Sequence, residues 1–188
     1  MRVPKNSGRS NLKHNDSILE LKKIIIRTFS ENDSITELTE LLHRAYKFLA
    51  DMGLHFVATW QGDDITLRQV KKGECFIAEL DGKMVGTILL YSWRNDDITL
   101  PQWYQRDDVR VFGKFAVDPD YQKQGIGNKL LEYIEEYNRK KGIKELALDT
   151  SDKAQHLIDY YLKRGYRIIC THQWPIVNYH SIVMSKTL

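Results

Sequence analysis

Long apolar runs are missing from this chain of 188 residues. No stretch approaches the roughly 18 apolar residues that a membrane-spanning helix needs, and the basic first residues are not followed by the apolar core of a signal peptide. Cysteine is scarce too, since Cys75 and Cys170 lie far apart in apolar segments with no paired cysteine motif around either. We therefore expect a soluble, cytoplasmic protein with free thiols and no membrane partner.

Motifs for metal and nucleophile chemistry are also missing. The sequence has no H-E-x-x-H helix, no cysteine cluster and no G-x-S-x-G nucleophile turn, so we expect no bound metal. Its net charge of +3 and pI near 8.7 are mild for a nucleic-acid-binding protein. A small positive excess does suit an anionic ligand. The composition thus predicts no nucleic-acid partner.

The chain does have enough apolar material for a core. Hydrophobic residues make up 42% and aromatic residues 11% of it, and its length suits one domain. Residues 1–16 carry almost no apolar side chains, which predicts a disordered tail because such a segment cannot offset the entropy of ordering. Residues 17–188 are predicted to form a single domain.

Hydrophobic periodicity predicts the element order β-α-α-β-β-β-α-β-α-β-β. Ser34 and Glu37 form a capping-box signature at the start of a helix that Gly53 ends. Asp81-Gly82 predicts a tight hairpin turn. The segment 92–108 predicts a long polar loop with aromatic anchors. The other predicted elements are strands at 24–29, 74–80, 83–91, 109–117, 144–149, 166–171 and 179–185, and helices at 63–72, 125–140 and 152–164.

A glycine-containing turn carries the strongest chemical signal. Gln122-Lys123-Gln124-Gly125-Ile126-Gly127 lies between an apolar strand and an amphipathic helix, where unpaired backbone N–H groups and the helix dipole attract an anion such as a phosphate. A dinucleotide fingerprint would need a third glycine at Leu130, and no G-K-[ST] of a nucleotide P-loop follows. The alternative is that Gly125 and Gly127 only permit a tight turn and close packing.

In this context the sequence resembles the GNAT superfamily of N-acetyltransferases. The family signature [QR]-x-x-G-x-[GA], after a strand that ends in a V-x-P-like segment, corresponds here to Val117 through Gly127. A second family pattern, Y-x-x-x-G-[FY], corresponds to Tyr161 through Tyr166. The resemblance covers residues 18–188. It implies an α/β (α+β) fold with a mixed, strongly bent central sheet of six or seven strands flanked by four helices, in which the strands ending at Val117 and Asp149 splay apart.

The resemblance also implies a ligand and a reaction. Acetyl-CoA would donate its acetyl group to a primary amine of a small molecule, peptide or protein, leaving CoA as product. Backbone groups of Phe115, Ala116 and Val117 would bond the pantetheine amides, and Gln122 through Lys129 would surround the pyrophosphate. The full set of implied cofactor-binding residues is Phe115, Ala116, Val117, Gln122, Lys123, Gln124, Gly125, Ile126, Gly127, Asn128 and Lys129.

The reaction asks for an oxyanion donor, an acid and a base. By resemblance the donor is a backbone N–H near Val117 and the acid is Tyr161, whose ordinary pKa of about 10 suits donation to a departing thiolate. Tyr161 also continues an apolar helix stripe, so simple packing is the alternative role. The base is left open, because Arg110, Phe112 and Lys114 alternate with Val111, Gly113 and Phe115 on the preceding strand and bring no acid. The candidates are Asp107, Asp108, Glu79, Asp149, His180 or a chain of water molecules.

Two further questions stay open at this stage. A non-catalytic acyl-CoA-binding regulatory module is the alternative to the enzyme. Aromatic and acidic residues in the loops near 92–108 and 172–178 suit the binding of a cationic amine. The alternative is that they anchor these loops or form the contact of a homodimer.

Overall fold

The computed structural model describes residues 23–91 and 99–188. The predicted tail 1–16 and part of the predicted loop 92–108 lie outside the described residues, and the single domain over 17–188 stays a prediction. Within the described ranges no helix is long and apolar enough to cross a membrane, and no cluster of potential metal ligands is present there.

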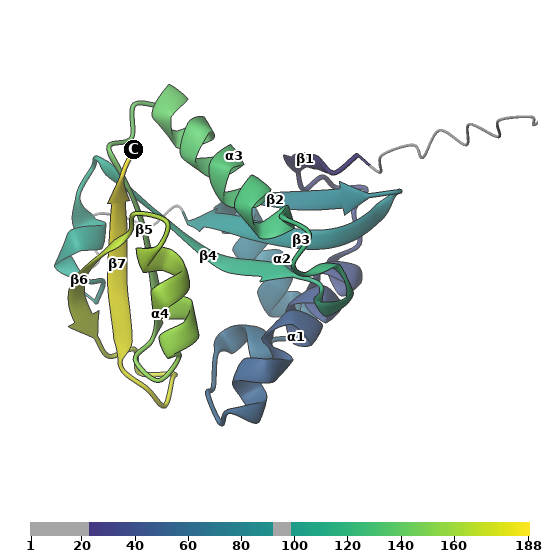
Figure 1. Cartoon of the computed structure of the whole chain (residues 1–188). Coiled ribbons are helices and arrows are strands. Elements are labelled where there is room, and N and C mark those ends of the chain that lie inside the picture. Colours follow the sequence, from purple (N-terminus) through teal and green to yellow (C-terminus); the bar gives the residue numbers. More distant parts are fainter. Residues whose placement is uncertain (1–22, 92–98) are drawn as a thin grey trace, which may run out of the picture.

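The described elements follow the predicted order (Figure 1). The strands are β1 Ile25–Thr28, β2 Gly73–Leu80, β3 Lys83–Tyr91, β4 Val109–Val117, β5 Glu145–Ser151, β6 Arg167–His172 and β7 Ser181–Thr187. The α-helices are α1 Ile35–Asp51, α2 Asp63–Lys72, α3 Ile126–Lys140 and α4 Gln155–Leu162. Short 3-10 helices occur at η1 Val57–Thr59, η2 Gln102–Gln105 and η3 Pro119–Tyr121. The predicted fold class is confirmed.

The central sheet is mixed and divides into two halves. Its strand order is β1-β2-β3-β4-β5-β7-β6. Strands β4 and β5 pair in parallel, and all the other neighbouring strands pair antiparallel. That parallel contact is short: it pairs Val109–Val111 with Glu145–Ala147. Beyond it β4 continues against β3 and β5 against β7, so the two strands diverge as predicted (Figure 1).

Local sequence signals account for two well-defined features. At the start of α1 the Ser34 hydroxyl accepts a hydrogen bond from the Glu37 N–H at 3.2 Å, which is half of the predicted capping box. The Glu37 carboxylate instead accepts from the N–H of Met84. In the hairpin turn, Asp81 has φ 51° and Gly82 φ 77°, as a two-residue turn with two left-handed positions requires.

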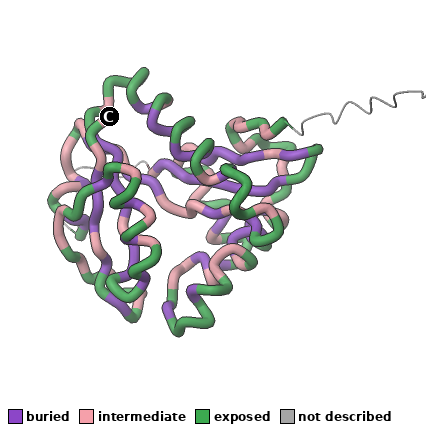
Figure 2. The backbone as a smooth tube through the Cα atoms, in the orientation of Figure 1, coloured by how far each residue is buried: buried purple, intermediate pink, exposed green. Residues whose placement is uncertain are grey.

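Two apolar layers enclose the sheet. Helix α3 packs on β1–β4 over a cluster that includes Phe76, Ile88 and Leu130, and α1 and α2 cover the opposite face over Leu41, Ile77 and Leu89. Figure 2 shows the buried strands between helices whose outer faces are exposed. The β1–β4 half of the sheet is thereby covered on both faces beside the place where β4 and β5 separate.

Some predicted boundaries are wrong by a few residues. Helix α4 begins at Gln155 rather than 152, because Ser151 accepts hydrogen bonds from the N–H groups of Lys153 and Ala154 and holds a turn there. It ends at Leu162, where left-handed Gly165, with φ 85°, turns the chain. Strand β5 continues to Ser151, and β7 runs over 181–187 instead of 179–185.

Candidate active site

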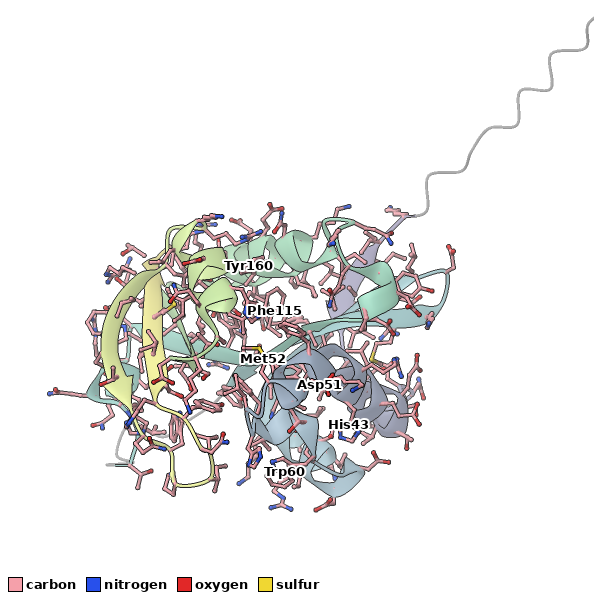
Figure 3. All side chains as sticks on the ribbon, turned by 60° about the horizontal axis from the view of Figure 1, so that its bottom comes forward. His43, Asp51, Met52, Trp60, Phe115 and Tyr160 are labelled. Atoms are coloured by element: carbon pink, nitrogen blue, oxygen red, sulfur yellow. The ribbon has the colours of Figure 1, made fainter. Side chains whose placement is uncertain are left out.

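A cavity of about 600 Å³ lies where β4 and β5 diverge. Its walls come from α1, β4, the turn before α3, β5 and α4. Figure 3 shows Phe115 of β4 beside Tyr160 of α4, with ring centroids 6.2 Å apart. The lining residues include Tyr46, Phe56, Gly113, Phe115, Ala116, Val117, Gln122, Lys123, Gly125, Ile126, Gly127, Asn128, Asp149, Thr150, Tyr161 and Arg164.

The turn before α3 forms one end of this cavity. Lys123 and Gly125 adopt left-handed backbone conformations, with φ 62° and 81°, which turn the chain from η3 into the helix. The N–H groups of residues 126–128 belong to the first helical turn and have no partner within the helix. Together with the helix dipole they make this end of the cavity suitable for an anion.

The two glycines have different reasons to be glycine. A Cβ on Gly125 would meet no atom within 4 Å, but its φ of 81° strains any other residue. A Cβ on Gly127 would lie 3.2 Å from Cζ of Phe115 and 3.4 Å from the Tyr160 hydroxyl. Gly127 therefore lets α3 approach β4 and α4 closely, while Gly125 fixes the shape of the turn.

Tyr161 lies in the wall of the cavity between the two halves of the sheet. Its side chain is 7% exposed and packs edge-on against Phe112, Tyr160 and Tyr166. Its hydroxyl donates to no described residue. Burial, followed by the nearby phenols of Tyr46 and Tyr166, raises the pKa of Tyr161 well above 10. The phenol therefore stays protonated at physiological pH, as a proton donor must.

Asp149 is the one carboxylate among the described residues that line the cavity. Its Oδ2 accepts hydrogen bonds from Ser181 Oγ at 2.7 Å and Trp174 Nε1 at 3.0 Å, and its Oδ1 accepts from the Tyr104 hydroxyl at 3.4 Å. These bonds fix the carboxylate in the part of the cavity wall that β5 forms.

The other carboxylates proposed as bases lie outside the cavity. Glu79 pairs with Arg27 at 2.8 Å and Asp108 with Arg106 at 2.7 Å. Neither Asp107 nor His180 is among the residues that line the cavity. Of the candidates, Asp149 alone is brought to the site.

Comparison with known proteins decides the family. Residues 35–166 match the Acetyltransferase (GNAT) family. The chain is also 34% identical over 134 residues to the S-(2-succino)cysteine N-acetyltransferase of Bacillus subtilis (strain 168), covering 69% of this chain and 76% of that protein. The chain belongs to the GNAT acetyltransferase family.

Other relatives agree with this assignment. The S-alkylcysteine N-acetyltransferase of Bacillus subtilis (strain 168) is 27% identical over 140 residues, which cover 72% of this chain and 75% of that protein. A solved structure of a GNAT family acetyltransferase from Elizabethkingia anophelis with acetyl-CoA bound has a TM-score of 0.64, with 20% identity and coverage of 88% of this chain and 98% of that one. The prediction of a GNAT N-acyltransferase is confirmed.

Most of the predicted cofactor-binding residues of this GNAT protein line the cavity. Gln124, in the turn, and Lys129, in the first turn of α3, are exposed and do not line it. Gln122 donates its side-chain amide to the carbonyl of Val117 at 3.1 Å, so this amide closes the turn.

Sequence reasoning missed a cationic group beside the turn. Arg164 donates to Asn128 Oδ1 from Nη2 at 2.6 Å, and its guanidinium lies 3.4 Å above the Tyr160 ring. Residues 160 and 164 are one helical turn apart, a spacing that places their side chains together. That spacing was the sequence signal that could have identified Arg164. The guanidinium of Arg164 gives the anion-binding end of the cavity a fixed positive charge.

Proposed function

We propose that this GNAT enzyme transfers the acetyl group of acetyl-CoA to the primary amine of a small S-substituted cysteine. Two relatives that each match about 70% of the chain are named for cysteine conjugates. The relatives named for the alanine of ribosomal protein bS18 match only 32% of the chain. A small amino-acid acceptor is therefore favoured over a protein acceptor.

The observation that carries the choice of a small acceptor is a clamp between two loops beside Phe56, which lines the cavity. Asn178, which precedes β7, donates to the carbonyl of Gly53 at 2.8 Å and accepts from the N–H of His55 at 3.0 Å. The adjacent Tyr179 packs on Phe56 with ring centroids 4.7 Å apart. These contacts join the loop before β7 to the loop after α1. An extended peptide would have to break them to pass through.

The glycine-turn end suits acetyl-CoA. The unpaired N–H groups of residues 126–128 match a pyrophosphate, and Arg164 adds a cation. The edge of β4 that β5 leaves free at residues 115–117 offers backbone groups to the pantetheine amides, like an added strand. These features support acetyl-CoA as the donor and the predicted contacts of Phe115, Ala116 and Val117.

In the proposed reaction the residues divide three tasks. The neutral amine of the acceptor forms a bond to the thioester carbon, and a backbone N–H near Val117 stabilises the resulting oxyanion. Asp149 takes the proton that the nitrogen loses, because bonding to the carbonyl carbon makes that nitrogen acidic enough to give its proton to a carboxylate. Tyr161 donates its hydroxyl hydrogen towards the sulfur as the C–S bond breaks and CoA departs.

Thiol release from acetyl-CoA tests this function. The purified enzyme should acetylate S-methylcysteine or S-(2-succino)cysteine with a kcat/KM at least tenfold above that for a peptide beginning with alanine. Comparable or better turnover of the peptide would reject the small-acceptor proposal. Tight CoA binding without turnover of any amine would favour the regulatory alternative. The cytoplasmic location, the absence of a nucleic-acid partner and the homodimer remain predictions from sequence.

A further inference from the structure

The side of the cavity that α1 and the loop after it contribute is apolar. Its lining residues are Ala45, Tyr46, Phe48, Leu49 and Phe56. Two neighbouring basic residues of α1 form ion pairs outside the cavity lining, Arg44 with Asp118 at 2.9 Å and Lys47 with Asp51 at 2.8 Å. A ligand on this side of the cavity therefore meets no charged residue of α1.

Four of the residues that line the cavity belong to one apolar cluster, which we call the apolar wall. They are Tyr46, Leu49, Phe56 and Leu157, the last from α4. The ring centroid of Phe56 is 5.7 Å from that of Tyr46 and 4.7 Å from that of the buried Tyr179. The Tyr46 hydroxyl donates to the carbonyl of Phe115 at 3.4 Å. The polar group of Tyr46 is thus already engaged within the protein.

The Asp149 carboxylate lies near the apolar wall. Besides burial, its negative charge raises the pKa of both Tyr46 and Tyr179, an effect that weakens with distance. In the described part of the chain, the lysine and arginine that line the cavity are Lys123, in the turn before α3, and Arg164, just after α4. The Arg164 guanidinium is already bonded to α3. A substituent that packs on the apolar wall therefore has a carboxylate nearby and no cation from the wall itself.

We propose that the apolar wall binds the S-substituent of the acceptor, so that the enzyme prefers cysteines with apolar S-substituents to those with anionic ones. This inference rests on the proposed function, because it names the class of S-substituted cysteine that the site takes. An apolar substituent gains free energy from burial against the wall. An anionic substituent would lose hydration without gaining a cationic partner, and the Asp149 carboxylate would repel it.

Two sets of acceptors test the proposal. For S-methyl-, S-ethyl- and S-propylcysteine, kcat/KM should rise about fourfold with each methylene, the usual worth of one buried CH₂ group. S-isobutylcysteine and S-carboxymethylcysteine have substituents with the same number of heavy atoms and the same branching, but only the carboxymethyl group is charged. The kcat/KM of the isobutyl compound should be higher by about tenfold or more, because an unpaired carboxylate is costly to desolvate.

Variants of Phe56 test where the substituent binds. Phe56→Arg brings a cation to the apolar wall and should raise kcat/KM for S-carboxymethylcysteine by about tenfold, since the carboxylate gains a partner. Phe56→Ala removes the ring and should flatten the rise across the alkyl series. The KM for acetyl-CoA should not change in either variant. Melting curves identify the folded variants, and Phe56→Ala still decides if Phe56→Arg does not fold.

Trp60→Ala is the matched control. Trp60 lies in the same loop as Phe56, but it is 53% exposed and does not line the cavity. Figure 3 shows Trp60 away from Phe115 and Tyr160, which do line it. Trp60→Ala should therefore keep the wild-type preference for the isobutyl compound and the wild-type rise across the alkyl series.

A readout independent of turnover is calorimetric titration of the enzyme–CoA complex with the same acceptors. S-isobutylcysteine should bind about tenfold more tightly than S-carboxymethylcysteine, and with a more negative heat-capacity change, the mark of buried apolar surface. Equal affinities and equal heat-capacity changes would contradict binding at the apolar wall.

The outcomes separate this inference from the proposed function. A wild-type enzyme that acetylates the isobutyl and carboxymethyl compounds equally well, or prefers the carboxymethyl compound, would overturn the inference and leave the proposed function intact. So would folded Phe56 variants that keep both wild-type trends. Failure of the wild type to acetylate any S-substituted cysteine would instead reject the proposed function, and this inference with it.

Discussion

The Tyr161 hydroxyl lies in the wall of the cavity and donates no hydrogen bond to any residue that the structure describes. Tyr161→Phe removes it but keeps the ring that packs against Phe112 and Tyr166. Stability should change by about 1 kcal/mol or less, whereas kcat should fall by about 100-fold, as expected for loss of a general acid. Steady-state kinetics under conditions where chemistry limits the rate check this, and kcat/KM for the acceptor should fall with kcat.

Tyr166→Phe is the matched control for that variant. Its hydroxyl contacts Glu135 at 3.5 Å, and Tyr166 is absent from the cavity lining. Turnover of Tyr166→Phe should stay near wild type. A wild-type kcat in Tyr161→Phe would mean that Tyr161 only packs in the core. The group that protonates the thiolate would then be unassigned.

Glycines 125 and 127 should respond differently to alanine. Gly125→Ala forces a left-handed conformation that costs about 1 kcal/mol, but its methyl group has open space. Gly127→Ala pushes against Phe115 and Tyr160. We expect Gly125→Ala to lower the melting temperature modestly, and Gly127→Ala to weaken CoA binding, because the turn, β4 and α4 move apart. Calorimetric titration of both folded variants with CoA tests this. Equal CoA affinities would contradict the different roles of Gly125 and Gly127.

Lys114 should reduce the stability of the protein at neutral pH. Its pKa is about 8 in the folded state and about 10.4 in an unfolded chain. The unfolded state therefore binds more protons between these values, and stability rises with pH across this window. Below pH 8, Lys114→Met should be more stable than wild type by about 1 kcal/mol after allowance for partial solvent access. The gain should vanish above about pH 10.5; a gain that persists there would contradict the charge explanation.

At the scale of elements, the loop clamp is the feature that we expect to affect binding of the acceptor but not binding of acetyl-CoA. Asn178→Ala removes both bonds between the loop before β7 and the loop after α1. The KM for a small acceptor should rise several-fold because the cavity becomes more open, while the KM for acetyl-CoA should not change. Gln173→Ala is the control, because its side chain bonds carbonyls within its own loop. Equal effects of both variants would show that general loop order matters rather than the clamp.

The sequence predicted most elements because their signals are local. The Asp81-Gly82 turn, the Ser34 cap and the apolar spacing of α3 each depend on a few neighbouring residues. Strand β4 has a bulge where Lys114 and Phe115 stand opposite one residue of β3. This bulge carries no comparable signal, since it arises from how β4 pairs with β3. Alternation along β4 therefore assigned Lys114 to the face of Phe112. The same limit hid the clamp, because Asn178 and Gly53 meet only after the chain has folded.

The site was predictable where a motif spans contiguous residues. The turn before α3 and Tyr161 were found this way, and both lie in the cavity. Asp149 remained one candidate among several, because a carboxylate at the end of a strand has no local mark of its function. Its role became arguable only when the divergence of β4 and β5 placed it in the wall of the cavity.

At the scale of the whole molecule, the short contact between β4 and β5 has a consequence for cooperativity. Strand pairing joins the β1–β4 half of the sheet to the β5–β7 half through three residue pairs, beside the shared core cluster and the loop clamp. Each half has its own, longer strand pairing. The two halves should behave as separate foldons that open to solvent with different free energies. A ligand seated between them, with contacts to both, should couple their opening and stabilise both. Amide hydrogen exchange followed by mass spectrometry should thus show two levels of protection without CoA that converge when CoA is bound. A single level in both conditions would mean that the three pairs suffice to make the sheet one unit.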